Sequence, residues 1–271
     1  MKTSKIRQVP MTVLGIIFLC IMIFPIYWML NSSLQTNGSA TSSSFFPLHP
    51  DFSGYQTALS QQTGNLVTSL IISIGSVIVS LVIAAPAAYA LAKFKIKWIS
   101  VVLIALLIAQ MIPGIVIANA LYTAYNHLGL LNTLPGLILA DASNGIPFAI
   151  LILRAFMGSI PPSLVEAARV DGASHFRAFV SIVLPISRNS IITAALFSFL
   201  FTWSDFVFAL TLTTGNSIKP VTLGIYTYLS GNVQQWSPVM ATAVLSSIPA
   251  IVLLIFAQRY IAAGALGGAV K

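Results

Sequence analysis

The sequence has 271 residues, of which 57% are hydrophobic and only 7% are charged. These charged side chains are too few to cover the surface of a soluble domain of this length. We therefore expect the lipid bilayer to be the solvent. The formal net charge is +8. The basic residues are distributed as the topology of a membrane protein would require, so no nucleic-acid partner is needed to explain the charge.

Six apolar runs reach the length of about 20 residues that a membrane-spanning helix requires. We therefore expect an all-α, polytopic membrane protein with six transmembrane helices. No internal repeat, coiled-coil heptad or soluble domain stands out. The six predicted spans are 10–30, 67–92, 99–125, 134–157, 189–213 and 239–260.

The first run follows a basic N-terminus, a pattern that signal peptides share. It is too long for the apolar region of a signal peptide and ends in Tyr27, Trp28 and Met29, so we interpret it as a span. Cys20 is the single cysteine, which excludes an intrachain disulfide bond. We expect its side chain to be a small buried hydrophobic group.

Lysine and arginine are retained on the cytoplasmic side of a membrane. Of the thirteen basic residues, only Lys219 lies in the opposite set of loops. Both termini and the segment 158–188 are therefore predicted to be cytoplasmic. The other basic residues are Lys2, Lys5, Arg7, Lys93, Lys95, Lys97, Arg154, Arg169, Arg177, Arg188, Arg259 and Lys271.

The outer connections differ in character. Residues 31–66 are rich in Ser, Thr, Gln and Asn and predict a solvated loop. The connection 126–133 is short. The connection 214–237 carries three aromatic residues that lie either at the membrane interface or against a partner protein, namely Tyr226, Tyr228 and Trp236.

Two acidic residues fall within the predicted spans. An ionised carboxylate at a helix centre costs about 2.5–3.5 kcal/mol on insertion scales, so Asp141 and Asp205 should face protein or water. At about 1.5 Å per residue, they lie about 10 and 12 Å from the outer ends of spans four and five, where they could line one cavity. Residues 143–147, which include Asn144 and Pro147, are expected to interrupt the fourth span.

These polar groups have two interpretations. Carboxylates, amides and an aromatic face suit a polyhydroxylated solute on the transport path. For each residue taken alone, interhelical hydrogen bonding that fastens the bundle is the simpler explanation. The candidates are Asn119, Asp141, Asn144, Trp203 and Asp205.

The segment 158–188 predicts a helix, a glycine turn and a second helix. Two prolines end the preceding span, and Ser163 with Glu166 has the form of a capping box that would begin a helix at Ser163. Gly172 should end that helix and Ser174 should cap the next. The second helix has an apolar side and ends where Leu184 and Pro185 redirect the chain; this side comprises Phe176, Phe179, Val180 and Val183.

No phosphate-binding loop of the form G-x-x-x-x-G-K-[S/T] occurs, so the chain has no visible means of binding ATP for hydrolysis, and any process that it drives must take its energy from a partner or an ion gradient. The histidines, His49, His127 and His175, are scattered through loops and suggest no metal site. No nucleophile with a general base stands out, and we predict that the chain is not an enzyme.

The stretch Glu166-Ala167-Ala168-Arg169-Val170-Asp171-Gly172, followed after nine residues by Ile182, Leu184 and Pro185, resembles the EAA loop of binding-protein-dependent ABC importer permeases. The likeness extends along the chain and is strongest to the carbohydrate-uptake branch, near maltose-transporter G-type permeases. Its further fragments are Ala87-Ala88-Tyr89-Ala90-Leu91-Ala92, Met111-Ile112-Pro113, Leu128-Gly129-Leu130, Arg154, Gln258-Arg259-Tyr260 and Gly268-Ala269-Val270-Lys271.

The resemblance implies an ABC importer type I permease fold in which 158–188 is a coupling segment that fits a cleft on an ATPase subunit. Glu166 would pair with a basic group there, although a helix-capping role alone would also explain it. The tail would reach between two ATPase subunits, or else be a disordered C-terminus. The implied coupling residues are Glu166, Ala167, Ala168, Asp171, Gly172, Ile182, Leu184 and Pro185, and those of the tail are Gly268, Ala269, Val270 and Lys271.

The resemblance also implies partners: a second permease, two ATP-binding subunits, an extracytoplasmic solute-binding protein and membrane lipid. No cofactor is expected in this chain, because ATP and magnesium would bind to the ATPase subunits. The expected substrate is a sugar, oligosaccharide or polyol, imported across a bacterial or archaeal cell membrane. An ion-coupled secondary transporter that uses Asp141 and Asp205 is the alternative.

We expect one transmembrane permease domain over 1–271. Residues 1–63 would form the first span and the outer loop, and 64–260 would form a five-span core that contains the coupling segment 158–188. Residues 261–271 would be a cytoplasmic tail.

Overall fold

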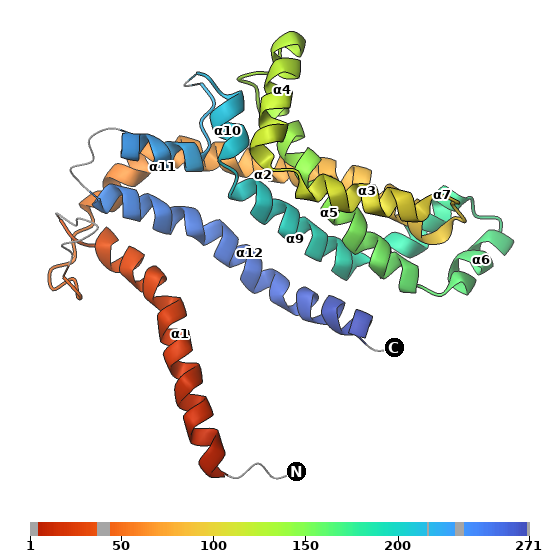
Figure 1. Ribbon diagram of the computed structural model, residues 1–271, viewed down its shortest axis with the longest axis horizontal. Coiled ribbons are helices and arrows are strands. Elements are labelled where there is room, and N and C mark those ends of the chain that lie inside the picture. The colour runs from red at the N-terminus through yellow and green to blue at the C-terminus, as the bar shows by residue number, and fades with distance from the viewer. Residues whose placement is uncertain (1–4, 37–43, 216, 231–235, 270–271) are drawn as a thin grey trace. The chain divides into compact units, whose positions relative to one another are not determined.

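The structure, a computed structural model, describes residues 5–36, 44–215, 217–230 and 236–269. In these ranges the regular secondary structure is entirely helical (Figure 1). Within the described residues, four helices are long and apolar enough to cross a membrane, and the number of spans rises to as many as six if each of two bent helix pairs counts as one. The all-α, polytopic prediction is therefore confirmed.

The chain divides into two compact units. The first comprises Met1–Gly64 and Ile225–Ile248, and the second comprises Asn65–Gly224 and Pro249–Lys271. Three helices contribute to both units: α2 (Ser53–Lys93), α11 (Val221–Ser230) and α12 (Ser237–Ala269).

In the first unit, α2 begins fourteen residues before the predicted start of span two. The Asp51 carboxylate accepts hydrogen bonds from the backbone amide of Ser53 at 2.9 Å and from its hydroxyl at 2.8 Å, which stabilises the first turn. The same bonds hold the pKa of Asp51 below its usual value. The prediction of a loop is therefore wrong for residues 53–66, because polar residues can form a helix once its start is capped.

The connection 214–237 contains the helix α11, which the sequence did not suggest. Tyr228 lies on α11, and its hydroxyl hydrogen-bonds to the Gln61 side chain of α2 at 2.9 Å. Tyr226 lies on the same helix and is exposed. Part of this aromatic connection is therefore helical and bonded to α2.

The helix α1 (Lys5–Ser33) exposes its apolar side chains along most of its length. Cys20 is among the exposed residues, so the prediction of a buried thiol is wrong. At its C-terminal end, α1 contacts residues that follow it in the chain: the Trp28 ring lies 5.7 Å from that of Phe45, and the Asn31 amide donates to the Ser44 carbonyl at 2.7 Å. A helix that exposes so many apolar side chains requires lipid or another protein around it.

In the second unit, α5 (Leu134–Ser159) packs along α9 (Arg188–Trp203). Its buried side chains belong to two clusters. One cluster joins α5 to α2 and α9 and includes Leu153 and Met157. The other joins α5 to α4 (Gly114–Leu128) and α10 (Val207–Leu212) and includes Leu137 and Ala140.

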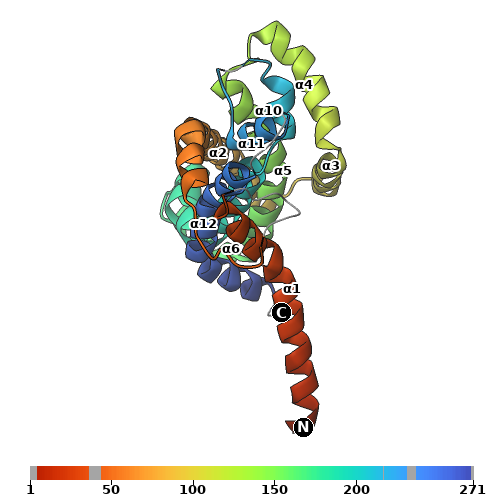
Figure 2. The same ribbon diagram turned by 90° about the vertical axis from the view of Figure 1, so that its left-hand side faces the viewer.

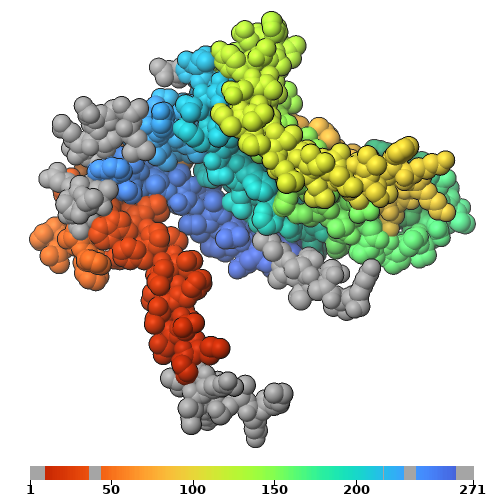
Figure 3. All heavy atoms as spheres, in the orientation of Figure 1, coloured from red at the N-terminus to blue at the C-terminus, as the bar shows by residue number. Residues whose placement is uncertain are grey.

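The predicted third span is two helices. The helices α3 (Ile99–Met111) and α4 meet at an angle of 93°, and α4 rises steeply from α3 in Figure 2. In the space-filling view of Figure 3, this pair lies on the visible face of the unit. Pro113 has no amide hydrogen and forces Ile112 into an extended conformation, with ψ of 125°, so a straight span is impossible.

The predicted fifth span is also interrupted. The helix α9 ends at Trp203, and α10 begins at Val207 after a short turn. Asp205 therefore lies in this turn and not inside a continuous helix. At its N-terminal end, α9 meets the preceding segment His175–Ile186 at a bend of 78°.

The fourth span, in contrast, is a continuous helix through residues 143–147, so the predicted interruption is wrong. Gly145 lies where a β-carbon would come within 3.0 Å of the Ser80 hydroxyl and 3.4 Å of the Ser198 hydroxyl. The Ser143 hydroxyl donates to the Ala140 carbonyl of the same helix at 2.6 Å. These small polar residues allow close helix packing and do not unwind the backbone.

Candidate functional site

The segment that follows α5 forms a short surface helix, α6 (Pro162–Val170). It begins one residue before Ser163, with Pro161 as N-cap and no capping hydrogen bond from a side chain. Proline is pre-organised for the first helical position, so Pro162 starts the helix and Ser163 already lies inside it. The predicted capping box is therefore wrong, and Glu166 has no capping role.

One side of α6 is anchored and the other is free. Val165 is buried in the cluster that joins α2, α5 and α9. Glu166 and Ala167 are exposed, and Val170 is 87% exposed. The helix thus presents the charged side chains of Glu166 and Arg169 and the apolar side chains of Leu164, Ala167 and Val170 outward, while its base belongs to the core of the second unit.

The turn after α6 has the predicted geometry. Gly172 has a φ of +85°, in the left-handed region, and its amide donates to the Arg169 carbonyl at 3.1 Å. The Ser174 hydroxyl accepts a hydrogen bond from the Arg177 amide at 3.1 Å and caps α7 (His175–Ala178). The glycine turn and the Ser174 cap are both confirmed.

The second predicted helix is divided into three parts: α7, the π-helical turn η1 (Phe179–Val183) and α8 (Leu184–Ile186). Phe179 and Val183 are buried as predicted, but Val180 is exposed and Phe176 is 74% exposed. A π-turn inserts an extra residue and changes which side chains share a face. The sequence therefore could not indicate that Phe176 would reach the surface.

The remaining coupling candidates line the same segment. Ala168, Ile182 and Leu184 are half-buried, whereas Asp171 and Pro185 are exposed. The Lys93 ammonium of α2, which the sequence suggested only as a topology signal, donates to the Ile160 carbonyl directly before α6.

Asp141 and Asp205 lie close together. Both line a small cavity of about 10 Å³ among α2, α5, α9 and α10, together with Ser69 and Thr202. Asp141 is 7% exposed. The expectation that the two acids line one cavity is confirmed, but this cavity has no room for a sugar, because about 10–15 Å³ is needed for a single water molecule.

The other three pathway candidates lie elsewhere. Asn119 on α4 and Asn144 on α5 are exposed and do not line the cavity. Trp203 is buried and stacks on Phe199, with ring centroids 5.4 Å apart. Their contact with a solute stays a prediction.

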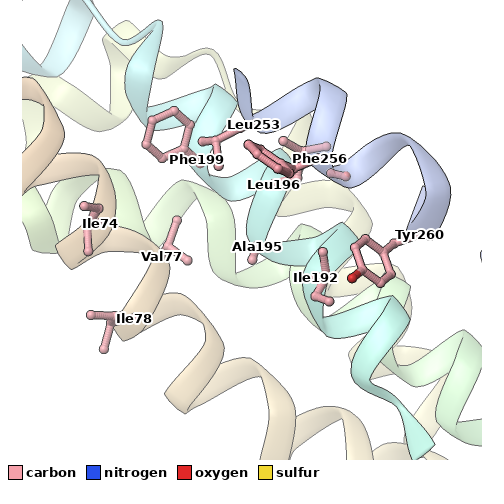
Figure 4. A pocket seen from close by; sticks show the side chains of 11 residues that line it. Ile74, Val77, Ile78, Ile192, Ala195, Leu196, Phe199, Leu253, Phe256 and Tyr260 are labelled. Atoms are coloured by element: carbon pink, nitrogen blue, oxygen red, sulfur yellow. The ribbon is translucent and has the colours of Figure 1, made fainter. Parts of the chain in front are cut away.

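A larger cavity of about 270 Å³ lies among α2, α9 and α12. Figure 4 shows Ile74 and Val77 of α2 on one side and Leu196 of α9 and Phe256 of α12 on the other. Its single polar side chain is that of Tyr260. A lining of this kind offers too few hydrogen-bonding groups for a polyhydroxylated solute.

The structure describes only part of the C-terminal tail. The Arg259 guanidinium hydrogen-bonds to the Tyr260 hydroxyl at 2.7 Å and lies 4.7 Å from its ring. Gly268 and Ala269 end α12, whereas Val270 and Lys271 lie outside the described residues.

Several apolar spans and a short surface helix seated on their buried core are the architecture of a membrane permease. The family model of the binding-protein-dependent transport system inner membrane component matches residues 80–266, so the chain belongs to this family. It is a multi-pass protein of the cytoplasmic membrane and a permease subunit of a binding-protein-dependent ABC importer. Because the chain belongs to this family, the alternative hypothesis of an ion-coupled secondary transporter is rejected.

Relatives support this assignment over the whole length of the chain. The trehalose transport system permease protein SugB of Mycobacterium tuberculosis is 31% identical over 92% of each chain. The diacetylchitobiose uptake system permease protein DasC of Streptomyces coelicolor is 29% identical over 100% of each chain. A chain in the crystal structure of a bacterial ABC transporter that imports the acidic polysaccharide alginate has the same fold, with a TM-score of 0.80, 23% identity, and coverage of 96% of this chain and 98% of that chain.

Proposed function

We propose that this permease forms half of the translocation pathway for a sugar, oligosaccharide or polyol and that α6 docks on a partner ATPase subunit. A second permease would form the other half, and ATP with magnesium would bind to two ATPase subunits. A solute-binding protein would deliver the substrate to the outer face. One observation carries the proposal: α6 exposes Glu166 and Ala167 while Val165 belongs to the buried core of the spans.

Because α6 is anchored in the core, a force on α6 would be transmitted to the spans. Val165 of α6, Phe179 of η1 and Leu153 of α5 belong to one buried cluster. Close-packed side chains transmit displacement because they cannot be compressed. A pull on α6 would therefore move α2, α5 and α9 together.

The exposed side of α6 has the chemistry of a protein interface. Glu166 would pair with a basic group on the ATPase, and the small Ala167 would allow close approach. Val170 and Phe176 add apolar area that is largely exposed in the isolated chain. In this cycle, ATP binding would close the ATPase pair and turn the pathway outward, and hydrolysis would return it inward.

The substrate class rests on the relatives, which are named for trehalose and diacetylchitobiose. Amide side chains that donate and accept hydrogen bonds suit the hydroxyl groups of such solutes. Asn119 and Asn144 are exposed on α4 and α5, and we assign them to the pathway surface. Uptake by Asn144→Ala should show a raised KM with normal assembly, and an unchanged KM would remove Asn144 from the pathway.

Co-purification from membranes tests the docking proposal. The tagged wild-type chain should retain an ATPase subunit, and Glu166→Lys should lose it while still inserted and folded. Gln56→Lys is the control, because it adds positive charge at an exposed position of α2, far along the chain from α6. An ATPase retained equally by Glu166→Lys would contradict the docking role of Glu166.

A further inference from the structure

The small cavity between Asp141 and Asp205 is the most unusual polar feature inside the second unit. Its volume of about 10 Å³ is near the lower limit of about 10–15 Å³ for one water-sized particle. Oxygen-bearing side chains from three helices and a turn reach it: Ser69 of α2, Asp141 of α5, Thr202 of α9 and Asp205 after α9. The remaining lining residues are apolar, namely Ile72, Leu137, Ala209 and Pro220. The cavity therefore has the size for one small particle with oxygen-bearing side chains from four residues beside it.

Two of these side chains lack a partner. Across the described parts of the chain, the Asp141 carboxyl group makes no hydrogen bond or ion pair, although it is 7% exposed. The Thr202 hydroxyl is equally without a partner there, in a residue that is 8% exposed. A carboxyl group and a hydroxyl in residues so largely buried gain from a polar or charged partner, and more so within a bilayer. Both line the cavity, so a particle within it could satisfy both.

Asp205 adds a second carboxyl group to the same place. Its carboxylate accepts hydrogen bonds from the backbone amides of Phe208 at 3.3 Å and Ala209 at 3.1 Å. Such charge-assisted bonds favour the ionised form. The Ser69 hydroxyl oxygen accepts a hydrogen bond from the Val221 amide at 2.8 Å and retains a second lone pair.

We propose that this cavity binds one small monovalent cation of the size of sodium, with Asp141, Asp205, Thr202 and Ser69 as oxygen ligands. Hard cations prefer carboxylate and hydroxyl oxygens. Bound there, the ion would neutralise charge and cross-link α2, α5 and the break between α9 and α10. This role goes beyond the proposed transport function and requires no contact with the transported solute.

Other metal ions fit less well. Calcium requires six to eight oxygen ligands, and magnesium usually keeps several waters, for which this cavity has no room. Transition metals favour clusters of His, Cys or carboxylate ligands, and no group of three or more such residues is placed to hold a metal in the described ranges. The two amide hydrogen bonds to Asp205 already offset part of its charge, so a single positive charge suits the cavity better than two.

The test uses the complete transporter, purified and studied at constant ionic strength. Sodium in place of choline should raise its Tm, because a ligand that binds only the folded state stabilises it. Binding of radioactive sodium should reach one ion per copy of this chain. Asp141→Asn should lose both effects, whereas Asp51→Asn, which changes a carboxylate in the outer loop, should keep them.

A milder pair of variants covers the case in which Asp141→Asn does not fold. Thr202→Val removes one proposed ligand and should lower the apparent sodium affinity. Thr193→Val is the matched control on α9. The Thr193 hydroxyl donates a hydrogen bond to the Asn189 carbonyl at 2.9 Å, and the residue does not line the cavity, so sodium affinity should not change. The proposal is overturned if Tm is the same in sodium and choline, if it responds only to pH or only to divalent ions, or if Asp141→Asn and Thr202→Val bind sodium as the wild type does.

Discussion

The Lys93 ammonium at the end of α2 donates a hydrogen bond to the Ile160 carbonyl, two residues before α6 begins. The two residues are 67 positions apart in the chain. This bond satisfies a carbonyl at the end of α5, where helices leave acceptors unpaired. It therefore fastens the base of the proposed coupling helix to a second span.

Lys93→Met should weaken this attachment and reduce transport per ATP hydrolysed. The expected loss of stability is about 1–2 kcal/mol, the range for a hydrogen bond from a charged group at a half-buried position. Uptake and ATPase activity, measured together in proteoliposomes, give the ratio. Lys97→Met removes an exposed charge from the connection that follows α2 and should leave the ratio unchanged. An equal fall in both variants would contradict a specific role for Lys93.

Gly172→Val should destabilise the turn after α6 and weaken ATPase binding. A side chain in the left-handed region costs about 1–2 kcal/mol, and a β-carbon at Gly172 would meet no atom within 4 Å, so the effect would come from the backbone alone. Co-purified ATPase per permease is the measurement. Gly158→Val has equal free space without a positive φ, so loss of the ATPase from both variants would argue against the turn.

Gly136→Ala should destabilise the start of α5. Its β-carbon would approach the Leu130 carbonyl oxygen to 2.2 Å, and relieving such a clash costs about 1–3 kcal/mol. Gly64→Ala meets nothing within 4 Å in the interior of α2 and should stabilise the helix by about 0.5–1 kcal/mol. Tm values of the two variants should shift in opposite directions, and a Tm unchanged in Gly136→Ala would show that the turn before α5 can adapt.

Thiol labelling should reveal the orientation of the chain. In a Cys20→Ser background, Lys219→Cys should react with a membrane-impermeant reagent in intact cells with an accessible outer face. Glu166→Cys should react only after the membrane is permeabilised, because the distribution of basic residues predicts α6 on the cytoplasmic side. The reverse pattern would invert the predicted topology.

The sequence by itself determined the membrane class, the existence of the apolar spans and the turn chemistry between α6 and α7. Composition and run length decide these, because each apolar run of sufficient length must meet lipid or protein. Gly172 and Ser174 were predictable for a local reason: a left-handed residue and a helix cap depend on their immediate neighbours. The capping box predicted at Ser163 does not form, for an equally local reason: Pro162 starts the helix one residue earlier, so that Ser163 already lies inside it.

Only the tertiary structure decided how the spans are broken and which side chains meet. Pro113 breaks the third span whereas Pro147 does not break the fourth, and nothing within either run distinguishes the two prolines. The exposure of Phe176 before the π-turn and the bond from Lys93 to Ile160 depend on the relative rotation of segments, which the sequence does not state. The sequence predicted that Asp141 and Asp205 could line one cavity, but the small volume of that cavity is set by the packing. Packing between helices fixes that rotation, because it depends on every side chain at the contact and not on the periodicity of one helix.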